Sequence, residues 1–89
     1  MQYIKYDLGN QRKGSVVEIT LSAATNVMLM DKVNLDLMQN NHKYNYIGHY
    51  VTMSPHRMTI PEDKHWFLVI ELLGTIKHGV KVIPPKLQS

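Results

Sequence analysis

The stretch SPHRMTIPEDKHWFLVIEL, residues 54–72, decides the fold. It predicts a strand, a polar turn and a second strand, and it contains the longest apolar run in the chain, residues 66–70. Val, Ile, Phe and Trp side chains fit a pleated surface, and a run that is apolar at consecutive positions indicates burial on both faces. We therefore predict that residues 66–70 belong to the central strand of the fold.

The chain has 89 residues, of which 44% are hydrophobic and 19% are charged. This is typical of one small globular domain with a marginal core, so dimerisation or docking on a neighbour is an alternative to a lone monomer. The sequence contains no cysteine, which excludes disulfides and favours a reducing compartment. Residues 1–10 lack the order of a signal peptide, and no apolar run approaches the roughly 20 residues of a membrane helix. We expect a cytoplasmic protein without membrane contact.

Short segments with the pattern of strands recur along the chain. Residues 15–22 alternate strictly, with Val17, Ile19 and Leu21 on one face. Residues 26–31 place Val27 and Leu29 on one side of a strand and two methionines on the other. The remaining predictions are an edge strand over 2–7, a turn over 8–14, and strands over 56–60 and 76–83.

One segment, residues 32–41, favours a helix. Val33, Leu37 and Met38 lie there at helical spacing, and Asn40-Asn41 predicts a stop. The segment is so short that one or two helical turns and a plain loop are both open alternatives.

Together these segments predict an all-β fold. The architecture is a small antiparallel β-sandwich or a partly open barrel of about seven short strands, with at most one short helix near residues 32–40. We expect residues 1–83 to form a single β domain. Residues 84–89, which begin with two prolines, cannot continue a ladder and are predicted to be a C-terminal tail.

A set of residues spread in order over nearly the whole chain matches one family pattern. They are Tyr3, Tyr6-Asp7-Leu8, Lys13-Gly14, Val17-Glu18-Ile19-Thr20-Leu21-Ser22, Asn26-Val27, Leu29-Met30-Asp31, Asn34, Tyr46, Gly48, Ser54-Pro55, Ile60-Pro61 and His65-Trp66. In these residues the chain resembles a bacterial family catalogued as domain of unknown function 1883. The resemblance implies a small, mostly β domain that occurs alone or at the N-terminal side of longer bacterial proteins, some with a Toll/interleukin receptor-type domain. It implies no activity.

The sequence offers only weak catalytic or metal-binding constellations. His42, His49 and His56 are spaced by seven, and this spacing alternates faces in a strand, so their rings do not converge. There is no Gly-x-Ser-x-Gly nucleophile elbow and no glycine spacing that fits a phosphate loop. We therefore favour a non-enzymatic protein without a cofactor. The alternative is a small metal-dependent or hydrolytic enzyme that uses His49, His56 or His65.

Tyrosines gather in residues 42–53, HKYNYIGHYVTM. If this segment is a strand, Tyr44, Tyr46 and Tyr50 share one face, and Gly48 leaves a gap between them. Tyrosine rings supply apolar area and their hydroxyls supply hydrogen bonds, which is typical of interfaces. The alternative is that the rings cover one end of the core or pair across strands. The candidate binding residues that surround the face are His42, His49 and Arg57.

The main hypothesis is a non-enzymatic binding or accessory domain that contacts a protein partner or a small ligand through the tyrosine face. A second hypothesis is single-stranded nucleic-acid binding, which combines positive charge with base stacking. Its residues are Lys43, Tyr44, Tyr46, Arg57 and Lys64. The net charge is +3, but Lys and Arg occur mostly singly, and this favours a solvated surface over a nucleic-acid interface.

Overall fold

A computed structural model describes residues 1–85 of the chain. These residues contain seven strands and one short helix. In chain order they are β1 (Tyr3–Gln11), β2 (Val16–Leu21), β3 (Thr25–Asp31), α1 (Lys32–Gln39), β4 (Ile47–Val51), β5 (His56–Thr59), β6 (Lys64–Glu71) and β7 (His78–Ile83). The strands predicted over 15–22, 26–31, 56–60 and 76–83 are confirmed, each with ends that shift by at most two residues.

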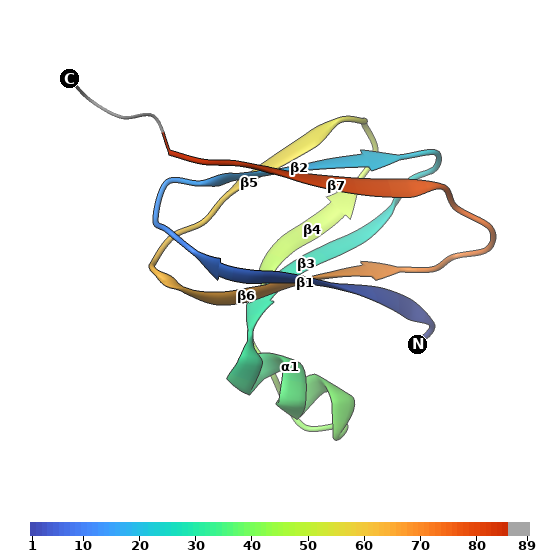
Figure 1. The fold of residues 1–89 in the computed structure, drawn as a ribbon. Coiled ribbons are helices and arrows are strands. Elements are labelled where there is room, and N and C mark those ends of the chain that lie inside the picture. Colours follow the sequence, from blue (N-terminus) through green and yellow to red (C-terminus); the bar gives the residue numbers. More distant parts are fainter. Residues whose placement is uncertain (86–89) are drawn as a thin grey trace.

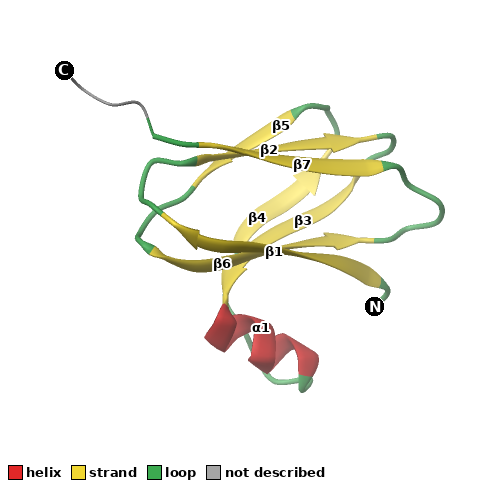
Figure 2. Cartoon of the chain, in the orientation of Figure 1, coloured by secondary structure: helices red, strands yellow, loops and turns green. Residues whose placement is uncertain are grey.

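The strands form two antiparallel sheets that pack face to face (Figure 1). The four-stranded sheet has the order β1-β6-β3-β4, and the three-stranded sheet has the order β5-β2-β7. Loops and turns gather at the two ends of these layers, as the colouring of Figure 2 shows. Of the two predicted architectures, the β-sandwich is therefore confirmed. Within residues 1–85, no helix is long and apolar enough to cross a membrane.

β6 is the central strand that the sequence predicts. It lies between β1 and β3, and each residue from Trp66 to Ile70 is at most 5% exposed. Trp66, Leu68 and Ile70 belong to the core between the two sheets, whereas Phe67 and Val69 belong to a cluster on the outer face of the four-stranded sheet. Burial on both faces explains why five consecutive positions are apolar.

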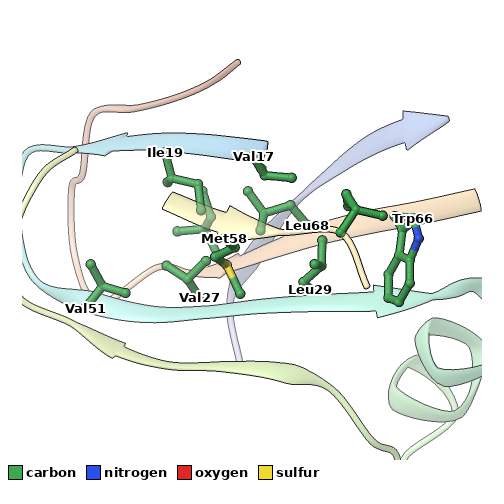
Figure 3. Packing of buried hydrophobic residues seen from close by; sticks show 10 residues of the cluster. Val17, Ile19, Val27, Leu29, Val51, Met58, Trp66 and Leu68 are labelled. Atoms are coloured by element: carbon green, nitrogen blue, oxygen red, sulfur yellow. The ribbon is translucent and has the colours of Figure 1, made fainter. Parts of the chain in front are cut away.

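β3 shows the same division, as predicted. Val27 and Leu29 point into the core between the sheets, and Met28 and Met30 point to the outer face. Figure 3 shows the core cluster, with Trp66 at one end of it.

The outer face of the four-stranded sheet is covered by α1, which packs against β3 and β6 (Figure 1). The helix alternative for residues 32–41 is thus confirmed. Its two turns bury Leu35 and Met38. The predicted apolar stripe is wrong at Val33, which is 67% exposed, because a helix of this length buries one stripe at i, i+3 spacing and Leu35 begins it.

The turn predicted over 8–14 is also partly wrong, because β1 continues to Gln11. Its pairing with β6 shifts between Asp7 and Gly9, which marks a β-bulge at Leu8. The bulge is held by the Asp7 carboxylate, which accepts a hydrogen bond of 2.9 Å from the Gly9 N–H. Gly9 has a φ of +69°, a conformation that suits glycine, and this allows the strand to pass the bulge and resume pairing.

The segment 42–53 is only partly a strand, since β4 begins at Ile47. Asn41, with a φ of +60°, turns the chain away from the helix, and residues 42–46 have no strand partner among the residues described. The Asn45 N–H donates instead to the side-chain oxygen of Asn34 in α1, at 2.8 Å. The prediction that one strand face carries Tyr44, Tyr46 and Tyr50 is therefore wrong, because two of the three precede the strand.

The predicted C-terminal tail, 84–89, lies outside the described residues from position 86 onward. Pro84 and Pro85 follow the end of β7 without strand structure, as expected from their lack of a backbone N–H.

Candidate functional site

β4 is an edge strand with an unusually apolar exposed surface. In the part of the chain described, it pairs with β3 on one side only. The side chains of Tyr46, Ile47, Tyr50 and Met53 are 50%, 45%, 53% and 79% exposed. They are four of the seven large hydrophobic side chains exposed in residues 1–85. We call β4 and its flanking residues Tyr46 and Met53 the β4 edge. Exposed apolar area gathered on one strand is typical of an interaction surface.

The side chains of β4 alternate between two environments. Ile47, His49 and Val51 lie opposite core residues of β3 and point towards the three-stranded sheet. Tyr50 points to the outer face, the face that α1 covers further along. The β4 edge thus presents apolar side chains on both faces of one short strand.

Gly48 is the one position on this strand where the backbone itself requires glycine. Its φ is +150°, and a Cβ atom built there would lie 1.9 Å from the carbonyl oxygen of Val27 in β3. No larger residue fits without moving one of the two strands. The sequence predicts a gap at Gly48 between the tyrosines, and this prediction is wrong, because the backbone of β3 occupies the space where a side chain would begin.

Edge strands offer unpaired backbone groups, and proteins commonly protect them with charged residues, prolines or bulges. Three of the four edge strands in residues 1–85 carry such protection, but β4, with the sequence IGHYV, has no Lys, Arg, Asp, Glu or Pro. The protecting features elsewhere are Lys5, Asp7 and the bulge at Leu8 in β1, Arg57 between Pro55 and Pro61 in β5, and Lys81 before Pro84 and Pro85 in β7.

A pocket of about 160 Å³ opens at the start of β4. It lies where β4 begins, β3 ends and the turn between β5 and β6 approaches. Its lining combines apolar and polar side chains: Leu29, Met30, Asp31, Asn34, Asn45, Tyr46, Ile47, Glu62, Lys64 and Trp66.

The polar groups of the pocket are already hydrogen bonded to one another. The Trp66 indole N–H donates to the Glu62 carbonyl oxygen at 3.0 Å, and the Lys64 ammonium lies 3.3 Å from the Asp31 carboxylate. Asp31 also accepts bonds of 3.0 Å and 2.8 Å from the backbone and side chain of Asn34. The backbone bond from Asn34, with smaller contributions from the Asn34 side chain and Lys64, lowers the pKa of the Asp31 carboxyl.

One side chain joins this network to the segment before β4. Asn34 donates to Asp31 and accepts from the Asn45 N–H at 2.8 Å. The start of α1 therefore holds the backbone of Asn45, the residue before Tyr46, in place at the beginning of the β4 edge.

The structure brings some of the predicted binding residues together. The Tyr44 and Tyr46 rings lie 5.8 Å apart between centroids. Tyr44 is half-buried and its hydroxyl donates to the Met28 sulfur at 3.9 Å, which fits the alternative that this ring covers the core. Tyr44 and His42 line a second hollow of about 380 Å³, together with Tyr3 and the end of α1.

Other predicted residues lie elsewhere. His49 of β4 packs edge-on against His56 of β5, with ring centroids 5.0 Å apart. The prediction that the histidine rings do not converge is wrong for this pair, because the two rings come from separate strands of the two sheets and not from one strand. Burial, followed by the neighbouring His49, lowers the pKa of His56. Arg57 lies on the outer face of the three-stranded sheet, 2.9 Å from the Glu18 carboxylate. It is therefore not part of a rim around the tyrosines.

The histidines do not assemble into a metal site in the described residues, where no three His, Asp or Glu side chains gather closely enough to hold an ion. His65 instead pairs with Asp7, its Nε2 lying 2.6 Å from the carboxylate, and it stacks on Phe67. The Gly9 N–H, followed by His65, lowers the pKa of Asp7. No serine or threonine hydroxyl is hydrogen bonded to this pair within residues 1–85.

The sequence profile of one family, described as "Domain of unknown function (DUF1883)", matches residues 1–86. The chain belongs to this family. The resemblance drawn from the sequence is thereby confirmed, and it extends over the strands, the helix and the pocket described above. The family is described without an activity. No curated protein and no solved structure matches the chain.

Sequence reasoning missed the residues that shape the pocket around Tyr46. Asp31, Asn34, Glu62 and Trp66 come from three separate segments, and only the fold brings them together. One signal was available, since Asp31 followed by Asn34 at the start of a helical pattern is typical of an N-cap.

Proposed function

We propose that this chain is a protein-binding module that pairs the free edge of β4 with an extended strand of a partner protein. The observation that carries the proposal is the contrast between β4 and the other three edge strands in residues 1–85. β4 contains no charged residue of the Lys, Arg, Asp or Glu type, no proline and no bulge, and it carries exposed apolar side chains on both faces. In strand addition, main-chain hydrogen bonds supply affinity and alternate side chains supply specificity.

Within this proposal the tyrosines have different roles. Tyr46 and Tyr50 are half-exposed on the β4 edge and are placed to cover a bound strand. Tyr44 supports Tyr46, because the Tyr44 ring lies between Tyr46 and Met28 of the outer cluster and contacts both. We expect Tyr46→Ala and Tyr50→Ala to keep the fold and weaken binding, and Tyr44→Ala to lower stability as well.

The test is to select peptides on the intact protein from a displayed library of random sequences. We expect the selected peptides to protect the backbone amides of β4 from hydrogen exchange. Tyr50→Lys places a charge on the exposed edge, as natural edge strands do, and should weaken the selected peptides at least about tenfold. The matched control is Thr59→Lys, which places the same charge at an exposed position on β5, and it should leave binding unchanged.

Two outcomes would contradict the proposal. One is that the selected peptides protect a segment other than β4. The other is that Tyr50→Lys and Thr59→Lys bind them as well as the unmodified protein does.

The second hollow favours small-ligand binding as an additional candidate function. Its volume of about 380 Å³ falls within the roughly 300–1,000 Å³ of small-molecule sites, and Tyr3, Met38, His42 and Tyr44 line it. A fragment screen by NMR tests it, and binders should shift the Tyr3 and Tyr44 ring signals. Binders that shift neither ring would exclude this site.

The nucleic-acid hypothesis receives less support. Arg57 and Lys64 each lie beside a carboxylate, Glu18 and Asp31 respectively, so their charges are partly neutralised. We further propose that the protein works in the bacterial cytoplasm, which its lack of cysteine supports.

A further inference from the structure

The size of the pocket at the start of β4 indicates whether a free small molecule or a side chain of a larger partner fits it. Its volume is about 160 Å³, well below the roughly 300–1,000 Å³ of sites that enclose a free small molecule. A space of this size fits a single aliphatic or aromatic side chain. An occupant of the pocket is therefore better supplied by a residue of a larger partner than by a separate ligand.

The position of the pocket matches the path of an added strand. Ile47, the first residue of β4, lines the pocket and points inward opposite Leu29. A strand that pairs with the free edge of β4 places every second side chain on this same inner face. The inward side chain nearest Ile47 then lies next to a residue that lines the pocket.

The lining calls for an apolar group in the pocket. The apolar or aromatic half of its lining is Leu29, Met30, Tyr46, Ile47 and Trp66. Ile47 and the Tyr46 ring are the exposed members of this half and offer an occupant most of the apolar contact. Within residues 1–85, every buried side-chain nitrogen and oxygen atom has a hydrogen-bond partner. The Trp66 indole N–H, for example, is bonded to the Glu62 carbonyl. The pocket therefore leaves no buried side-chain nitrogen or oxygen unpaired, and a polar anchor would exchange its hydrogen bonds to water for groups that are already bonded.

The rim of the pocket adds a preference for positive charge. Two carboxylates, Asp31 and Glu62, face one ammonium, Lys64, so the rim is acidic on a chain whose net charge is +3. Lys64 lies closer to Asp31, at 3.3 Å, than to Glu62, at 3.8 Å. Glu62 is also 62% exposed, so its carboxylate is accessible to a cation of a partner. Such rim charges contribute to specificity and association rate.

We propose that this pocket receives one bulky apolar side chain of the strand that pairs with β4, and that a basic residue two positions along that strand, towards the turn 61–63, pairs with Glu62. This inference rests on the proposed function and names the kind of partner: an extended segment with an aliphatic or aromatic anchor and a neighbouring Lys or Arg.

The test uses short synthetic peptides of alternating Thr and Val, with substitutions at two positions. One is a central residue whose side chain would face the pocket, and the other lies two positions away on the same face of the peptide strand. The central residue is Leu, Phe or Ala, and the second is Arg, Gln or Glu. Binding to the isotope-labelled protein is followed by NMR through the β4 amides and the indole N–H of Trp66, the sole tryptophan. Replacing the Leu or Phe anchor by Ala should weaken binding about tenfold or more, as expected for the loss of one buried apolar side chain.

Two variants of the protein identify the contacts. Ile47→Ala removes part of the apolar lining and should reduce the advantage of Leu or Phe over Ala. Glu62→Gln should abolish the preference for Arg over Glu and leave the anchor preference intact. Leu73→Ala is the matched control, since Leu73 is exposed and apolar but belongs neither to the β4 edge nor to the pocket lining.

The outcomes separate this inference from the proposed function. If peptides bind along β4 but tolerate Ala as well as Leu, the inference is wrong and the proposed function stands. If no peptide binds, two copies of the chain could instead pair through β4. Light scattering would detect this as a dimer that Tyr50→Lys dissociates. The occupant is then a second copy and the inference is wrong. If neither peptides nor a second copy bind at β4, both proposals fail.

Discussion

Replacement of Asp31 separates two contributions that one carboxylate makes at the junction of β3 and α1. Asp31 is the N-cap of α1 and accepts from the Asn34 N–H at 3.0 Å, and it also lies 3.3 Å from the Lys64 ammonium. An N-cap contributes about 0.5–2 kcal/mol, and a partly exposed ion pair contributes about 1 kcal/mol at most. We discount the ion pair because the Lys64 side chain is 42% exposed. Asp31→Ala should therefore lower the free energy of unfolding by about 1–2 kcal/mol.

Asp31→Asn is the matched variant, because Asn caps a helix as well as Asp does but carries no charge. It should cost less than about 1 kcal/mol, since only the ion pair is lost. Urea denaturation followed through the fluorescence of Trp66, which is 5% exposed, measures both variants. For a domain of this size each kcal/mol lowers the melting temperature by roughly 4–8 °C.

The same pair of proteins predicts a dependence on pH. Because hydrogen bonds from Asn34 and the nearby Lys64 lower the pKa of Asp31 in the folded state, its carboxylate stabilises the fold above the unfolded-state pKa. That stability is lost as the pH falls through the lower pKa of the folded state. The difference between the unmodified protein and Asp31→Asn should be constant above about pH 5 and shrink below about pH 4. Equal destabilisation by Asn and Ala, or a difference that persists in acid, would refute the assignment of cap and charge.

Two further predictions concern the β4 edge. Gly48→Ala should destabilise the fold by about 1–3 kcal/mol or more in urea denaturation, because the new Cβ atom would lie 1.9 Å from the Val27 carbonyl oxygen. Gly79→Ala is the control, since its Cβ atom would meet only the rotatable Thr20 hydroxyl. Equal effects of the two substitutions would contradict the clash at Gly48. The pKa of His56 is lowered mainly by burial and further by His49. The neutral ring should therefore contribute stability above the unfolded-state pKa of about 6.5, and this stability is lost as the pH falls through the folded-state pKa. His56→Gln should flatten this part of the curve of stability against pH, and an unchanged slope would argue against the role of His56.

The sequence was sufficient for the all-β class and for most strands, because the strands carry strong local patterns, but it left a sandwich and a partly open barrel as alternatives. The alternation of Val17 and Ile19 and the continuous run from Trp66 to Ile70 each report how many faces of a strand are buried. The family resemblance rested on residues spread over the same elements, and the match over residues 1–86 confirms it.

The candidate site was harder to predict, because it depends on contacts that sequence spacing does not contain. Period-two alternation placed Tyr44, Tyr46 and Tyr50 together, but the bond from Asn45 to Asn34 holds the first two ahead of β4. The bulge at Leu8 was missed for a similar reason. Glycine is common in turns, so the sequence treats Gly9 and Gly14 alike, and only the pairing of β1 with β6 shows that Gly9 lies within a strand. Which strand becomes an unprotected edge is likewise a property of the sheet order.

The pairing of β1 with β6 and of β2 with β7 has a consequence for how the protein is made. During synthesis, the chain up to residue 60 can form only the β3–β4 and β2–β5 pairs, and the apolar side chains of β3 have no central strand to pack against. Both sheets are completed only after β6 and β7 leave the ribosome, so the closing contacts join residues far apart in sequence and folding should be slow for a domain of this size. A fragment that stops before residue 64 is therefore expected to aggregate rather than to behave as half of a domain.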